Sequence, residues 1–157
     1  MANKVPKKYT QGLSKSTSDK RKAEIRKRQK GKKSFEKLPG DTKAETKPSK
    51  YTKRIKASGL RSVIQEETTK KTGSQRERFI KAVASVTDIP KGIIQEVYDK
   101  GLAAWAVGHR PGATQDQWAR ARVYSFISRG KTTETADKQL FEDAKEALKK
   151  KGKRFPR

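Results

Sequence analysis

The stretch Lys91–Val107, KGIIQEVYDKGLAAWAV, decides the fold class of this 157-residue chain. Its apolar residues recur every three or four positions, which is the period of one face of an α-helix. The stripe consists of Ile94, Val97, Tyr98, Gly101 and Trp105, widened by Ile93, Leu102 and Ala104. Because a glycine in such a stripe brings no side chain, Gly101 predicts close contact with another helix. The sequence therefore predicts a core helix here.

Three further segments show the same helical period, and they occupy residues 74–87, 115–129 and 136–150. Thr114 and Gln117 have the spacing of a capping box at the start of the second of these segments. The loop Gly108–Gly112, with two glycines and a proline, separates it from the stretch quoted above. No segment shows the two-residue alternation of a strand. We therefore expect an all-α domain, a small bundle of about four short helices, in residues 74–150.

Charge dominates the composition. Lys and Arg number 41 against 17 Asp and Glu, giving a net charge of +24, and only 31% of residues are hydrophobic. A globular domain usually has about 45–50% apolar residues, so the whole chain is not expected to share one core. Cations placed on phosphates release counterions and gain entropy, so a polyanion is the expected partner. Nucleic acid is the first candidate and an anionic membrane surface the second.

The charge is concentrated in residues 1–56, which hold almost no large apolar side chains. Ordering a residue costs about 1–2 kcal/mol in chain entropy, which such a composition offsets poorly. We therefore expect a long disordered basic arm at 1–56, in which the run Ser18–Lys30 becomes helical once a partner neutralises it. Residues 57–73 are expected to form a linker or short docking helix, and 151–157 a basic tail.

Several classes of protein are disfavoured. The chain has no cysteine, which removes thiolate metal sites and disulfides. The first twenty residues lack an apolar signal core, and no apolar run approaches the roughly 18 residues of a membrane span. We therefore expect no membrane insertion and no secretory signal.

A candidate nucleic-acid surface lies on the helix predicted at 115–129. Trp118, Arg122 and Arg129 share its outward face with Ser125. Guanidinium groups bind phosphate through two hydrogen bonds and indole stacks on bases. In the alternative, Trp118 packs under a neighbouring helix and the arginines pair with acids. With the arm included, the expected nucleic-acid contacts are Lys20, Arg21, Lys22, Arg26, Lys27, Arg28, Lys30, Lys32, Lys33, Arg110, Trp118, Arg122, Arg129 and Lys131.

The only histidine, His109, lies beside Arg110 in the 108–112 loop. A catalytic interpretation makes His109 a general base and Arg110 an anion clamp. No nucleophile or carboxylate has a spacing that would orient the imidazole, and one histidine without cysteine does not make a three-ligand metal site. We expect a structural loop whose side chains hydrogen-bond helix ends, and therefore no enzyme, no cofactor and no metal.

Between Phe79 and Leu140 the chain carries an ordered run of short motifs. They are Gly101-Leu-Ala-Ala-Trp105, Gly108-His-Arg-Pro-Gly-Ala-Thr114, Gln117-Trp-Ala, Ala121-Arg-Val, Ser125-Phe126, Gly130-Lys-Thr132 and Thr135-Ala-Asp137. This run resembles an uncharacterised domain family of small basic proteins from tailed cyanobacterial phages and large DNA viruses of algae. The resemblance implies a viral origin and says little about mechanism.

Together these observations predict a viral, virion-associated protein that binds nucleic acid, with DNA the expected partner, through phosphate contacts of weak sequence specificity. The alternative is a capsid or tail structural protein whose helical domain docks on another virion protein. Either protein is expected in the virion or the host cytoplasm.

Overall fold

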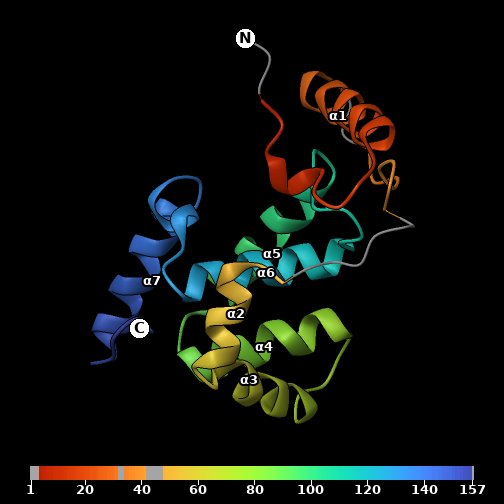
Figure 1. Ribbon diagram of the computed structural model, residues 1–157. Helices are drawn as coiled ribbons and strands as arrows, with labels where there is room; N and C mark the ends of the chain where they lie inside the picture. The colour runs from red at the N-terminus through yellow and green to blue at the C-terminus, as the bar shows by residue number, and fades with distance from the viewer. Residues whose placement is uncertain (1–3, 32–33, 42–47, 157) are drawn as a thin grey trace. The chain divides into compact units, whose positions relative to one another are not determined.

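The computed structural model describes residues 4–31, 34–41 and 48–156, and within these ranges the protein is all-helical (Figure 1). The α-helices are α1 Lys15–Lys30, α2 Lys50–Ala57, α3 Leu60–Thr69, α4 Gln75–Thr87, α5 Lys91–Trp105, α6 Gln115–Ile127 and α7 Lys138–Lys150. Two short 3-10 turns, η1 Lys7–Tyr9 and η2 Lys131–Glu134, accompany them.

The prediction of about four helices behind a long disordered arm is wrong. The range 1–56 contains α1 and all but the last residue of α2, and each helix begins with a serine cap: Ser14 accepts from the Thr17 amide and Ser49 from the Thr52 amide. The few large apolar residues before α2 include a buried cluster. Val5, Ile25 and Leu38 are buried together. A small apolar cluster and a polar network centred on Arg21 therefore hold residues 4–31 and 34–41 together.

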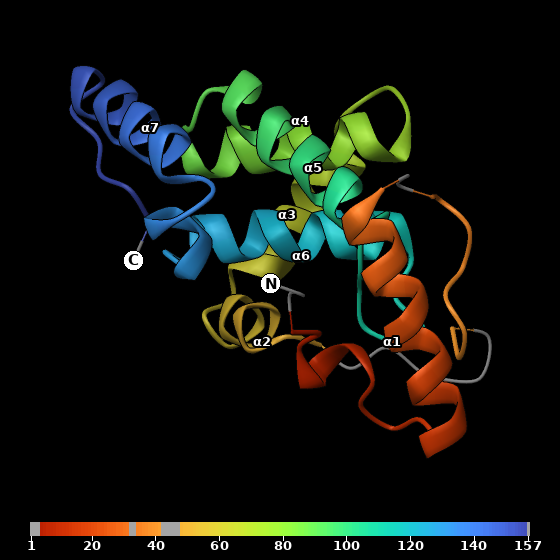
Figure 2. The ribbon, with the colours of Figure 1, turned by 90° about the horizontal axis from the view of Figure 1, so that it is seen from above.

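The chain divides into two compact units, each built from two stretches. The first unit comprises Met1–Lys47 and Leu102–Trp118, and the second comprises Pro48–Gly101 and Ala119–Arg157. In the first unit α1 lies beside the loop that joins α5 to α6, as two perpendicular views show (Figures 1 and 2). The boundaries expected from the sequence, at 56, 73 and 150, remain predictions about which fragments fold alone.

The second unit contains most of the apolar core. Its buried side chains include Ile55, Ile64, Phe79, Ile80, Val83, Ile94, Val97, Tyr98, Val123, Phe126, Ile127, Leu140 and Leu148. The α3 helix packs on α4, and α4 begins with a capping box between Ser74 and Glu77. The Phe79 ring meets Tyr124 edge-on at a centroid distance of 5.8 Å. Aromatic contacts of this kind stabilise beyond their buried area.

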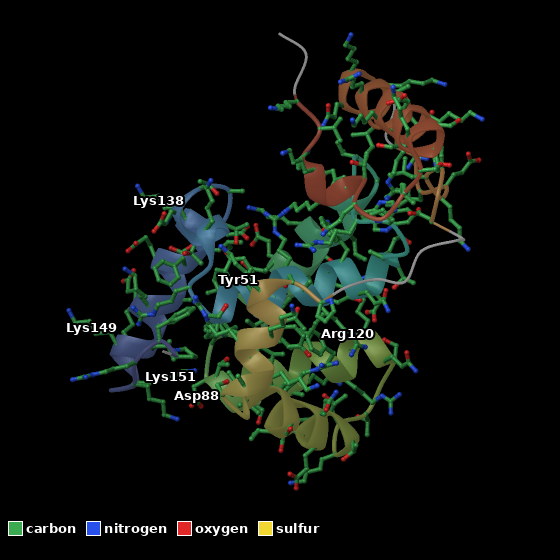
Figure 3. The ribbon with its side chains drawn as sticks, in the orientation of Figure 1. Tyr51, Asp88, Arg120, Lys138, Lys149 and Lys151 are labelled. Carbon is green, nitrogen blue, oxygen red and sulfur yellow. The ribbon has the colours of Figure 1, made fainter. Side chains whose placement is uncertain are left out.

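The C-terminal segment is part of this core. Phe155 is buried and its ring centroid lies 4.8 Å from that of Phe141 and 5.7 Å from that of Phe126. Two lysines before it bind the end of α4. The Lys151 ammonium donates to the Asp88 carbonyl (Figure 3). Lys153 pairs with the Asp88 carboxylate at 2.9 Å. The basic tail expected from the sequence is thus anchored by an aromatic side chain.

The glycine predicted to permit a close helix contact does so. A Cβ built on Gly101 would lie 2.6 Å from the Ala119 Cα, a separation that real Cβ atoms essentially never show, so α5 and α6 approach backbone to backbone. The Thr114–Gln117 capping box is also confirmed, with both reciprocal hydrogen bonds at 3.1 Å.

We expect Gly101→Ala to lower the free energy of unfolding by about 1–3 kcal/mol, because an added methyl at this contact forces the two backbones apart. Gly92→Ala, in the same helix, is the matched control, since a Cβ there meets nothing within 4 Å. That change should be neutral or stabilising because alanine favours helix over glycine. Urea unfolding of both variants measures the difference, and equal stabilities would contradict the close contact.

Candidate nucleic-acid interface

The α1 helix has two faces of different character. Its buried residues are Arg21, Ile25 and Arg28, spaced i, i+4 and i+7. The opposite face is exposed and carries cations over the length of the helix, with Asp19 the one acid among them. The exposed cations of this face are Lys15, Lys20, Arg26, Lys27 and Lys30; we call them the α1 basic face.

Arg21 fixes the position of this helix. Its side chain is 0% exposed. Its Nε donates to the Tyr9 carbonyl at 2.6 Å, and its Nη2 donates to the His109 carbonyl at 2.7 Å. Its Nη1 donates to the Pro39 carbonyl at 2.9 Å and to Asp41 Oδ1 at 2.6 Å. One guanidinium therefore joins three separate stretches of the first unit.

The Asp41 carboxylate is the second centre of this hydrogen-bond network. Oδ2 accepts from His109 Nε2 at 2.7 Å and from the Leu38 amide at 2.8 Å. Oδ1 accepts from Arg21 and from the Gly112 amide at 3.2 Å. Four hydrogen bonds therefore satisfy a carboxylate that is only 4% exposed, as a buried charge requires.

His109 completes the network at the end of α5. Its Nδ1 lies 2.9 Å from the carbonyl of Trp105, the last residue of that helix, and its ring stacks on the indole with centroids 4.2 Å apart. The indole Nε1 donates to the Ala113 carbonyl at 2.7 Å. Each His109 nitrogen therefore faces an oxygen acceptor of the first unit, and the ring joins the loop to Asp41 and to the end of α5.

The network shifts the pKa of Asp41. Burial by itself raises this pKa, but hydrogen bonds from His109 and Arg21 and the nearby positive charge outweigh burial and lower it from 3.8 to about 2. A carboxyl whose folded pKa is lowered contributes stability above its unfolded pKa and loses it as pH falls through the folded pKa.

We therefore expect the side-chain carbon of Asp41, followed by NMR, to titrate with a midpoint near 2. The ionised carboxylate then contributes about 2 kcal/mol above pH 4, and this contribution disappears as the pH falls from about 4 to about 2. A midpoint at or above 3.8, the ordinary value, would show that Asp41 lacks these donors in solution.

The structure separates the predicted contacts in the N-terminal segment into two groups. Lys20, Arg26, Lys27 and Lys30 are exposed on the α1 basic face, and Lys22 is half-buried at its edge. Arg21 and Arg28 are buried, and Arg28 donates to Glu24 Oε1 at 3.1 Å and to the Ser34 carbonyl at 2.9 Å. We therefore remove these two arginines from the interface. Lys32 and Lys33 lie outside the described residues.

Two of the predicted contacts, Arg122 in α6 and Arg129 just after it, are engaged within the protein. Arg122 binds Asp137 through two hydrogen bonds, at 2.9 and 3.1 Å, with its side chain 17% exposed and that of Asp137 0% exposed. Arg129 is exposed, but it donates to the carbonyls of Phe155 and Pro156. The arrangement of Arg122 is the acid-paired alternative given above, so we do not place Arg122 in the interface.

The remaining predicted contacts lie in different places. Trp118 is half-buried in the first unit, where Tyr9 meets it edge-on at 5.7 Å. Arg110 is half-buried in the loop that carries His109. Lys131 is exposed at the start of η2 in the second unit.

The cations of the α1 basic face differ from a group of other cations that pair with carboxylates. Pairs of this kind outside α1 include Arg122 and Lys100 with Asp137, Lys70 and Lys71 with Glu67, Arg76 with Asp99, Lys145 with Glu142, Lys150 with Glu146 and Lys153 with Asp88. On α1 the paired cations are the buried Arg21 and Arg28. Among the residues that the structure describes, no carboxylate pairs with the five cations of the α1 basic face.

Sequence reasoning missed Asp41 and Phe155. Asp41 lies in a polar stretch with no periodic neighbour that marks it. Phe155 did have a signal, because a large aromatic residue within a basic tail is more often buried than solvated.

Within residues 4–31, 34–41 and 48–156, no helix is both long and apolar enough to cross a bilayer. No three His, Cys, Asp or Glu side chains among those residues are grouped as metal ligands.

Within the described residues, the fold and the site thus define a basic, all-helical protein whose α1 helix displays cations that no carboxylate there pairs with. A family profile described as "Family of unknown function (DUF5824)" matches residues 6–148, and the chain belongs to this family. No curated protein and no solved structure matches the chain.

Proposed function

We propose that this protein binds nucleic acid through phosphate contacts made by the α1 basic face. The observation that carries the proposal is the absence of acidic partners for these cations among the described residues, on a helix whose other face is fixed by Arg21. Cations already paired with carboxylates must break those pairs before they bind phosphate. Cations without such partners bind phosphate and release its counterions without first breaking an ion pair.

Duplex DNA is the form of nucleic acid that fits best. A helix of 16 residues is about 24 Å long, so the α1 basic face is long enough to contact several phosphates of a duplex. The major groove of B-DNA admits an α-helix, whereas that of A-form RNA is too narrow for side chains to read. Lysines dominate the face, and lysine contacts phosphate as a point charge, so we propose weak sequence specificity.

We further propose a viral, virion-associated role, in the virion or the host cytoplasm. This part of the proposal rests on the resemblance of the 79–140 motifs to proteins of phages and large DNA viruses. We also propose that the protein acts by binding and not by catalysis, because the imidazole of His109 is held by Asp41 and the Trp105 carbonyl.

Lysine reactivity tests the proposal directly. We expect mixed-sequence duplex DNA to protect Lys20, Lys27 and Lys30 from acetylation, because phosphates cover their ammonium groups. Lys91 and Lys138, exposed lysines of the second unit, serve as controls and should stay reactive. If the α1 lysines react equally with and without DNA, the interface is not on α1.

One observation supports the alternative of a capsid or tail structural protein. Phe35 is 60% exposed, which is unusual for a large apolar side chain and suits an anchor in another protein. If this alternative holds, the protein will occupy a regular position in the particle and remain there after nuclease treatment. If the nucleic-acid proposal holds, nuclease will release it with the genome.

A further inference from the structure

A second group of exposed cations lies in the second unit, on α2. This helix, KYTKRIKA, has four cations and no acid, and its buried residue is Ile55. Lys50 and Lys53 share the face opposite Ile55, with Arg54 and Lys56 at its two edges, and all four are exposed. No carboxylate of the described ranges pairs with any of them.

The loop after α6 adds to this group. Tyr51, at the start of α2, accepts a hydrogen bond from the Lys131 amide at 3.1 Å (Figure 3). Arg54 donates to the Ser128 carbonyl at 3.2 Å. The exposed Lys131 side chain is therefore brought to the same part of the second unit as the α2 cations.

The surroundings of the Tyr51 ring show that this surface is electropositive. The Lys50 ammonium lies 5.0 Å from the ring centroid and the Arg54 guanidinium 6.0 Å from it. The pKa of Tyr51 is lowered, first by the hydrogen bond from the Lys131 amide and then, against the effect of burial, by Lys50 and Arg54. A positive environment that favours the phenolate favours any anion placed there.

We propose that Lys50, Lys53 and Arg54 of α2, together with Lys131 of the loop that Tyr51 binds, form a second phosphate-binding surface for a nucleic-acid strand. This inference deepens and rests on the proposed function, because it names a separate set of contacts to the same partner. The surface binds phosphate through its positive charges. The Tyr51 hydroxyl accepts from the Lys131 amide and so positions Lys131 beside α2.

Nucleic acid is favoured here over an anionic membrane. A helix that lies on a bilayer buries a row of large apolar side chains between the acyl chains. The large hydrophobic side chains exposed among the described residues are Phe35 and Val63, and neither belongs to α2. This surface therefore offers charge without an inserting apolar face.

The test compares two double variants with identical chemistry. Lys50→Gln with Lys53→Gln removes two charges from the proposed surface and leaves Arg54, which holds the loop, in place. Lys91→Gln with Lys138→Gln removes two exposed lysines from elsewhere in the same unit. The affinity of each full-length variant for duplex DNA is measured by fluorescence anisotropy from about 50 to 200 mM salt.

For the α2 variant we expect log affinity to fall less steeply with log salt than for the unchanged protein, with the magnitude of the slope smaller by about 1.8, or about 0.9 per lost contact. The control variant should show little change. Equal slopes for both variants would overturn the inference. Binding of the α2 variant to vesicles containing phosphatidylserine is measured in parallel. A loss on vesicles without a loss on DNA would also overturn the inference, in favour of a lipid surface.

The outcome is separable from that of the proposed function. If variants of the α1 basic face lose affinity while the α2 variant does not, the proposed function stands and the second surface is wrong. If only the α2 variant loses affinity, the second surface stands and the interface on α1 is wrong. Circular dichroism of each variant verifies that the helices are intact.

Discussion

Arg21→Ala should lower the free energy of unfolding of the first unit by about 3–5 kcal/mol, because it leaves the buried charge of Asp41 without one of its partners. It also removes donors from the Tyr9, Pro39 and His109 carbonyls, which are then unsatisfied. Total stability is about 5–15 kcal/mol for ordinary domains, so the loss is large enough to release α1. The release of α1 is measured by amide hydrogen exchange across Lys15–Lys30.

Arg26→Ala is the matched control, because Arg26 is an arginine of the same helix on its exposed face. Exposed substitutions of this kind usually change stability by less than about 0.5 kcal/mol. Protection of the α1 amides should therefore be lost in the Arg21 variant and kept in the Arg26 variant. Similar exchange in both would mean that Arg21 does not fix the helix.

The second large effect concerns binding. Changing Lys20, Arg26, Lys27 and Lys30 together to Gln should strongly weaken the affinity for duplex DNA, because four phosphate contacts and their counterion release are lost. Glutamine keeps the length and helix propensity of these side chains while it removes their charge. The affinity is measured by fluorescence anisotropy at low salt, where electrostatic contacts count most.

A matched set of changes controls for net charge. Lys4, Lys37, Lys91 and Lys138 are exposed lysines outside α1, and changing these four to Gln removes the same charge from other places. We expect this variant to bind nearly as well as the unchanged protein. Equal losses in the two variants would mean that overall charge, and not the α1 basic face, determines binding.

The helices of the core could be predicted from the sequence because helical periodicity is a local signal. The helix predicted at 91–107 is α5, Lys91–Trp105, and the one predicted at 115–129 is α6, Gln115–Ile127. Local rules also predicted the contact of Gly101 and the capping box of Thr114 and Gln117. Each of these predictions depends on residues within a few positions of one another.

The order of the N-terminal segment was missed because its cause is not local. Arg21 looks like any arginine in a charge run, but its partners Asp41 and His109 lie 20 and 88 residues away. Composition arguments count apolar residues and do not count such a network. Composition reflects the chain-entropy cost of ordering this segment, but it does not reveal the buried hydrogen bonds that offset that cost.

One signal for the buried face of α1 was present in the sequence. Ile25 is the only large apolar residue between Leu13 and Phe35. A lone isoleucine in a helical charge run marks the buried face, and its neighbours at i−4 and i+3 are Arg21 and Arg28. The position of Ile25 alone is therefore enough to separate the cations on this face from those on the exposed face.

The salt dependence of DNA binding by the unchanged protein and by the variant of Lys20, Arg26, Lys27 and Lys30 tests the central claim most directly, because the slope counts phosphate contacts. We predict a linear fall of log affinity with log salt for both, with the slope smaller by about 3.6 in the variant. An unchanged slope, with the helices of the variant intact, would contradict the claim that the α1 basic face binds the nucleic-acid backbone.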